Sequence, residues 1–210
     1  MQRCLDNMQG GVKLGWTLLL LIAVAGFGES LTAQKVVASQ ELNLANDSRY
    51  ELFSLGNGQT VLYRDEPGKV ILDAFGPDLQ MDWSRELSLD KTRPKPVGAA
   101  VLEGVVHVFY TFRRDRKLHL KLHRYSERGN LSDSLIVTEL DGEFLTPDWT
   151  LVANESNETV VLWNQRDSDT FLFIAVELST GRVLYRKVVE LDFGPMLGNV
   201  IENIYVDARG

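Results

Sequence analysis

The sequence predicts an all-β protein assembled from repeated units of four short antiparallel strands. Three observations carry this prediction. A short phrase recurs about every 50 residues, as SRELSLD (84–90), IVTELD (136–141) and KVVELD (187–192), with an earlier echo, SQELNLA, at 39–45. Between the phrases, short apolar and β-branched segments alternate with turns rich in Gly, Pro, Asn and Asp. One segment, 117–123, places leucines at every second residue, which is a strand period.

Each unit divides into four expected strands. The first strands are expected at 50–55, 97–102 and 149–153, and the second strands contain the apolar triplets 61–63, 108–110 and 161–163. The third strands are expected at 70–75, 118–125 and 171–178, and the recurring phrase ends the fourth. Alternate side chains of a strand point to opposite faces. The leucine alternation therefore predicts a buried face on 118–125 and a solvent-exposed face that carries His119 and His123.

Four antiparallel strands in about 50 residues are typical of one blade of a β-propeller. A single meander exposes two apolar faces, and neighbouring blades cover those faces. We therefore expect an incomplete β-propeller at residues 34–210. Its three blades are expected at 50–89, 97–140 and 148–191, flanked by a single outer strand at 36–44 and a single inner strand at 200–206.

The expected ring is incomplete, since known propellers have about four to eight blades. This count predicts that the chain is the N-terminal part of a longer propeller. The alternative is an open arc that pairs with another copy or another protein. In that case the edge at 200–206 would favour self-association through an edge strand.

The third blade contains the stretch AVELSTGRVLY at 175–185. With its alanine, acidic residue, Thr-Gly turn and aromatic residue, this stretch resembles the repeat of pyrroloquinoline-quinone-type propellers. The first blade keeps a weaker version at Ala74, Asp78, Leu79 and Trp83, and the second departs further. The resemblance implies a shared type of blade and no bound cofactor.

Residues 1–33 are predicted to be a secretory signal peptide. Arg3 and Lys13 precede an apolar run, 16–27, which is shorter than the roughly 20 residues of a membrane-spanning helix. Cleavage is expected after Ala33, with Gly28 as the alternative, and an uncleaved membrane anchor is the competing interpretation. The protein would then be secreted or periplasmic, and the Thr-Ala-Gln sequence at the cleavage region favours a bacterial source. Its single cysteine, Cys4, would be removed with the signal.

The net charge of −7 argues against a nucleic-acid partner, because such proteins concentrate positive charge. A protein or glycan ligand is compatible with this balance. The one cluster of basic residues is Arg113, Arg114, Arg116 and Lys117, and we expect it to form a solvated hairpin turn around Asp115.

No catalytic, metal-binding or cofactor-binding residue is identified. His119 and His123 lie four apart on an expected strand, about 13 Å from each other, so they cannot share a zinc ion. The carboxylates Asp65, Glu66, Asp167 and Asp169 are expected to serve turns. The tryptophans Trp83, Trp149 and Trp163 are expected to pack between blades, with Trp149 the candidate for a central channel. Four sequons, at Asn46, Asn130, Asn154 and Asn157, are interpreted as turn residues.

These observations predict an exported, non-catalytic propeller module that binds a protein or glycan or acts as a scaffold. The alternative is the N-terminal part of a propeller-type hydrolase such as a glycosidase. In that enzyme, carboxylates from successive innermost strands would converge within about 5 to 10 Å.

Overall fold

The computed structural model describes residues 49–56, 58–90, 94–140, 148–167, 169–191 and 204–207. In this part of the chain every regular element is a β-strand, so the all-β prediction is confirmed. The expected signal peptide at 1–33 and the expected strand at 36–44 lie outside the described residues. Of the strand expected at 200–206, only 204–206 are described, and they are not part of a strand.

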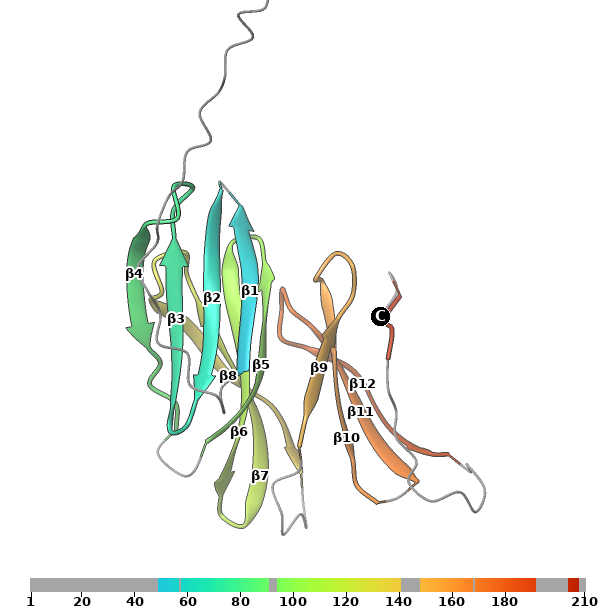
Figure 1. Ribbon diagram of the computed structural model, residues 1–210. Coiled ribbons are helices and arrows are strands. Elements are labelled where there is room, and N and C mark those ends of the chain that lie inside the picture. Colours follow the sequence, from blue (N-terminus) through green and yellow to red (C-terminus); the bar gives the residue numbers. More distant parts are fainter. Residues whose placement is uncertain are drawn as a thin grey trace, which may run out of the picture. The chain divides into compact units, whose positions relative to one another are not determined.

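The described strands form three four-stranded antiparallel sheets (Figure 1). The first sheet contains β1 (Arg49–Gly56), β2 (Gln59–Glu66), β3 (Lys69–Phe75) and β4 (Met81–Glu86). The second contains β5 (Lys95–Leu102), β6 (Val105–Arg114), β7 (Lys117–Tyr125) and β8 (Leu131–Leu140). The third contains β9 (Thr150–Ala153), β10 (Thr159–Gln165), β11 (Thr170–Glu177) and β12 (Val183–Glu190).

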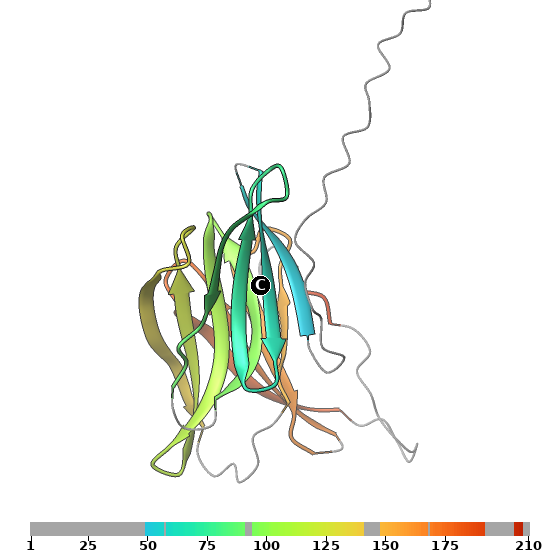
Figure 2. The same cartoon turned by 60° about the vertical axis from the view of Figure 1, so that its left-hand side comes forward.

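Within each sheet the strands lie in chain order, and Figure 2 shows β1 to β4 side by side in that order. Short turns produce this arrangement, because a two-residue connection can join only adjacent antiparallel strands. Pro67 and Gly68 connect β2 to β3, and Asp115 and Arg116 connect β6 to β7. The predicted hairpin around Asp115 is therefore confirmed.

Two apolar clusters join the three sheets. One contains Val61, Tyr63 and Leu72 of the first sheet together with Val106 and Val108 of the second. The other joins the leucines of β7 to the third sheet, with members Leu118, Leu120, Leu122, Leu162 and Ile174. The first strands of the sheets also meet, since β1 lies beside β5 and β5 lies beside β9. Burial of these apolar side chains is the main force that holds the sheets together.

The prediction that His119 and His123 face solvent is wrong. Only 6% of His119 and 4% of His123 is exposed. The leucines of β7 do form one face, which packs toward the third sheet. The opposite face is also covered, because the second sheet lies between two others and Tyr125 of β7 joins the cluster shared with the first sheet. A strand inside a stack of sheets therefore buries both of its faces.

The recurring phrase marks the end of each fourth strand, but its leucine does not occupy one structural position. Leu140 is buried and pairs with Leu118 across the β7–β8 ladder. In the first sheet the corresponding residue is Leu87, which is buried and donates its N–H to the carbonyl of Val70 over 2.8 Å. Leu89 lies beyond β4, and Leu191 lies just beyond β12. In the first unit the residue equivalent to Leu140 thus lies two positions before Leu89, the leucine that the recurring phrase predicts.

Candidate binding pocket at the junction of the first two sheets

A pocket of about 860 Å³ lies where the end of the first sheet meets the start of the second. The start of β1, the β2–β3 turn, the segment after β4 and the start of β5 supply its walls. The charged residues that line it are Arg49, Asp65, Glu66, Lys69, Glu86, Asp90 and Lys95. Pro67, Pro94 and Pro96 also line it and restrict the backbone of the turns that form the walls. The pocket thus has charged groups of both signs on a constrained backbone.

Arg49, the first residue of β1, connects the first sheet to the second. Its Nη2 donates to the carbonyl oxygen of Val97 over 2.7 Å, and its Nε donates to Oε1 of Glu51 over 2.7 Å. A Cβ atom on Gly98 would lie 2.5 Å from this Nη2, so any other residue there would displace the guanidinium from its present position. Arg49 is therefore held by contacts on both sheets.

Asp65 and Glu66, at the end of β2, differ in their electrostatic surroundings. Burial raises the pKa of Asp65, and Glu51 adds to the rise while Arg49 opposes it. In contrast, hydrogen bonding from Lys69 lowers the pKa of Glu66, which also pairs with Arg64. Asp65 thus retains a proton more readily than an ordinary aspartate, and Glu66 less readily than an ordinary glutamate.

A chain of hydrogen bonds leads from the pocket wall into the stack. Asp90 accepts hydrogen bonds from the hydroxyl of Tyr110 at 2.6 Å and from Nζ of Lys121 at 2.8 Å. Because the hydroxyl of Tyr110 donates to Asp90, it accepts from Nε2 of His123, 2.8 Å away. Nδ1 of His123 in turn accepts from the hydroxyl of Tyr125 over 3.1 Å. The donors and acceptors agree in direction along the whole chain.

The pKa values along this chain follow from burial and from the hydrogen bonds. Burial alone would raise the pKa of Asp90, but the hydrogen bonds from Lys121 and Tyr110 hold it below its usual range. Burial, assisted by the charge of Lys121, lowers the pKa of His123 to about 4. Burial raises the pKa of Tyr125 to about 12, and burial with the neighbouring Asp90 raises that of Tyr110. At neutral pH the hydrogen-bond chain therefore links the uncharged side chains of Tyr125, His123 and Tyr110, and it ends at the carboxylate of Asp90, which pairs with the ammonium group of Lys121.

The second and third sheets are linked beside the pocket by an ion pair. Lys95, the first residue of β5, pairs with Asp148, two residues before β9. The side chain of Lys95 is 42% exposed and that of Asp148 is 96% exposed, so the pair contributes little stability. It places one cation and one carboxylate beside the pocket.

The predicted turn carboxylates are found in different settings. Asp167 and Asp169 are exposed in the β10–β11 connection, as the turn interpretation requires. Asp65 and Glu66 instead end a strand and line the pocket. Among the sequons, Asn130 is exposed and Asn154 is buried, and Asn46 lies outside the described residues.

The three predicted tryptophans also differ in their location and burial. Trp83 of β4 donates its Nε1 hydrogen to the carbonyl of Glu127 over 3.0 Å, which places it between the first and second sheets. Trp149 precedes β9 and is buried in the cluster shared by the second and third sheets, so its candidacy for a central channel was wrong. Trp163 lies on the opposite face of the third sheet, half-buried beside Phe171 and Phe173.

The sequence interpretation missed Asp90, Tyr110, Lys121 and Tyr125 as a group. The alternation of 119, 121, 123 and 125 was a usable signal, because one face of one strand carried only polar or aromatic residues. The same alternation is typical of a strand whose polar face meets water, so it does not by itself indicate a buried partner. The partner, Asp90, is 31 residues from Lys121 in the chain.

The first strands of the three sheets bring few carboxylates together. Among β1, β5 and β9, only β1 carries one, Glu51, and it pairs with Arg49. In the described parts of the chain, no group of three or more His, Cys, Asp or Glu residues could hold a metal ion.

The residues with assigned positions include no helix that is long and apolar enough to cross a membrane. No model of a known protein family matches the chain, and no curated protein matches it either.

Proposed function

We propose that this protein is an exported, non-catalytic binding or scaffold module of β-propeller type, and that it is the N-terminal part of a longer propeller. The observation that carries the proposal is the stacking of three four-stranded sheets through their faces, with their first strands adjacent. Blades of a propeller stack in this way, with the first strand of each blade nearest the axis.

The outward face of the third sheet supports the expectation of further blades. In the first sheet, Val61 pairs with Ala74 and Tyr63 pairs with Leu72, and all four are buried against the second sheet. The corresponding pairs in the third sheet are Val161 with Ala175 and Trp163 with Phe173. The face that the first sheet buries against its neighbour thus recurs on the third sheet, where Val161 and Ala175 are buried and Trp163 and Phe173 are half-buried. A fourth sheet of the same kind would complete that contact.

The charges around the pocket support binding over catalysis. Arg49, Glu66 and Asp90 each pair with another residue of the protein, so they are poor mobile acids or bases. Fixed charges of both signs on a constrained backbone are typical of recognition of a polar ligand such as a glycan or a peptide.

One observation favours the alternative of a propeller-type glycosidase. Asp65 lines the pocket and burial raises its pKa, which is the property a general acid needs. Its partner carboxylate would then be Glu51 or a residue of a further blade. This hypothesis predicts that Asp65→Asn abolishes hydrolysis.

The test combines an activity assay with a binding assay on the full chain. We expect no release of fluorophore from a panel of 4-methylumbelliferyl glycosides, and we expect binding on an array that presents glycans and peptides. The variants Asp65→Asn and Glu86→Gln, which change two carboxylates of the pocket, should alter binding without altering a hydrolysis signal. Hydrolysis by the wild type that Asp65→Asn removes would overturn the proposal in favour of the enzyme.

A further inference from the structure

The hairpin between β6 and β7 carries the basic cluster of an otherwise acidic protein. Its cations are Arg113, Arg114, Arg116 and Lys117, and the carboxylates beside them are Asp115 and Glu139. Arg114, Asp115, Arg116 and Lys117 are all exposed. Against a net charge of −7, this hairpin tip is a local excess of positive charge on a protruding turn.

The backbone of the tip is unusual for the residues it holds. Asp115 has φ of 51° and Arg116 has φ of 63°, so both central residues of the two-residue turn are left-handed. Such turns favour Asn-Gly, and arginine is disfavoured at the second position because its Cβ crowds the backbone. The corresponding turn of the first sheet has Gly68 at that position, with φ of 85°. Glycine is the unstrained choice at this position, so Arg116→Gly can remove the side chain without straining the backbone.

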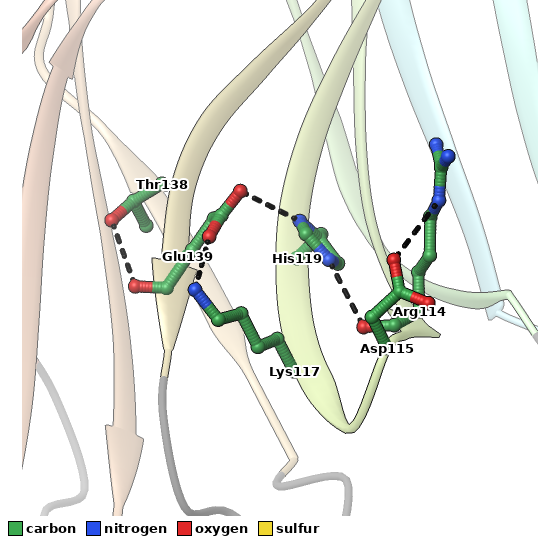
Figure 3. Close-up of polar contacts among 6 residues, drawn as sticks. All are labelled: Arg114, Asp115, Lys117, His119, Thr138 and Glu139. Carbon is green, nitrogen blue, oxygen red and sulfur yellow. Dashed lines mark hydrogen bonds and ion pairs between the residues drawn. The ribbon is translucent and has the colours of Figure 1, made fainter.

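The tip stands on a rigid support (Figure 3). The ladder between β6 and β7 continues without interruption to the pair Arg114 and Lys117. The ring of His119 stacks on Phe112 with centroids 4.9 Å apart, and its Nε2 donates to the carbonyl of Arg114 over 3.3 Å. Oε2 of Glu139 accepts a hydrogen bond from Lys117 over 3.0 Å. These contacts hold the backbone of the tip and one of its cations in place.

The ion pair of Arg114 is weaker than that of Lys117. Nε of Arg114 lies 3.6 Å from Asp115, and the two side chains are 73% and 86% exposed. An ion pair of that length and exposure is weak, so an external anion can replace Asp115. The guanidinium of an arginine binds carboxylate and sulfate oxygens with two parallel hydrogen bonds.

We propose that this hairpin tip binds an acidic polysaccharide, whose carboxylate or sulfate groups pair with Arg114 and Arg116. The inference goes beyond the proposed function, because the tip residues are not among those that line the pocket at the junction of the first two sheets. A polysaccharide fits better than a membrane, since the apolar residues nearest the tip, Phe112 and Leu118, are buried and no apolar side chain is offered to lipid. It fits better than a single-stranded nucleic acid, because Phe112, the aromatic residue nearest the tip, is buried and offers no ring on which a base could stack.

The experiment measures binding of the full chain to immobilised polygalacturonate, heparin and neutral dextran at low and high salt. The wild type should bind the two acidic polymers at about 0.05 M salt and lose them at about 0.5 M, since exposed charge pairs are screened by salt. Arg114→Ser with Arg116→Ser should weaken binding about tenfold. The matched control, Arg128→Ser with Arg182→Ser, removes the same charge from other exposed turns and should change binding by less than about twofold.

Arg116→Gly separates binding from folding. Glycine relieves the left-handed backbone, so the melting temperature should stay the same or rise while the acidic polymers bind less tightly. Full binding by Arg116→Gly, or equal loss in the tip variant and its control, would overturn the inference, and so would binding to phosphatidylserine vesicles but to no polysaccharide. Failure here and failure of the proposed function are distinguishable. Glycoside hydrolysis would overturn only the proposed function, and absence of acidic-polymer binding would overturn only this inference.

Discussion

Replacing Tyr110 by phenylalanine removes one hydroxyl from the middle of the hydrogen-bond chain and leaves the buried ring in place. The hydroxyl donates to the carboxylate of Asp90 at 2.6 Å and accepts from His123 at 2.8 Å. A hydrogen bond to a charged group contributes about 1.5–3 kcal/mol, and a buried donor left without an acceptor costs about 1–3 kcal/mol. Lys121 still pairs with Asp90 in the variant, so the carboxylate keeps one partner. We therefore expect Tyr110→Phe to lower the free energy of unfolding by about 2–4 kcal/mol.

The assay is urea unfolding at neutral pH, followed by tryptophan fluorescence, with a thermal scan in parallel. For a protein of this size, 1 kcal/mol corresponds to about 2–4 °C in melting temperature, so the expected decrease is on the order of 5–15 °C. The control is Tyr185→Phe on β12, where the side chain is 41% exposed and the change should stay within about 0.5 kcal/mol.

Equal free energies of unfolding of Tyr110→Phe and its control would refute this prediction, because they would mean that the hydrogen bonds of the Tyr110 hydroxyl contribute no net stability. A double-mutant cycle with Asp90→Asn tests the same point independently. The two residues should couple by about 1 kcal/mol or more, and strict additivity would show that the 2.6 Å hydrogen bond carries no energetic coupling.

Three further outcomes are expected. Burial lowers the pKa of His107 and His123 to about 4, from about 6.5 in the unfolded chain, so the unfolded state binds more protons between these pH values. The free energy of unfolding should therefore be highest above about pH 6.5 and fall by up to about 3 kcal/mol per histidine as the pH drops toward 4. A free energy of unfolding by urea that does not change over this pH range would contradict this. Gly129→Ala should cost about 2–3 kcal/mol, because Gly129 has φ of 69° and the added Cβ would lie 2.7 Å from the ring of Trp83. Gly68→Ala should cost about 1 kcal/mol, because its φ is 85° but no atom lies within 4 Å of the added Cβ. Equal melting temperatures of the two variants would exclude the clash with Trp83. Asp73→Ala should cost about 3 kcal/mol, because it removes the fully buried carboxylate that pairs with Arg64 and leaves that cation with Glu66 alone. Asp133→Ala removes a half-exposed carboxylate that pairs with Arg124, so it should cost less than about 1 kcal/mol. A similar loss in both variants would show that burial of the carboxylate adds nothing to the Arg64 pair.

The strands and their order could be predicted from local patterns. The segment expected at 118–125 falls within β7, and the triplet at 161–163 falls within β10, because alternation and turn residues act over a few neighbouring positions. The hairpin around Asp115 was also predictable, since a short charged run separates two apolar segments. Export, the blade count and the ligand class stay predictions, which the experiments above address.

The candidate site was not predictable in the same way. Asp90, Lys121 and His123 belong to one hydrogen-bond chain only because the first and second sheets stack. The polar alternation of β7 is the same whether that face meets water or another sheet, so the pattern could not distinguish a wet histidine from a buried one.

By itself, the sequence determined that this protein is made of strands, which strands pair as hairpins, and where the basic turn lies, because each of these depends on residues close in the chain. The tertiary structure decided which faces are buried, which charges are paired and where the pocket forms. Those properties arise from contacts between sheets, whose residues lie tens of positions apart, and from the exclusion of water between them.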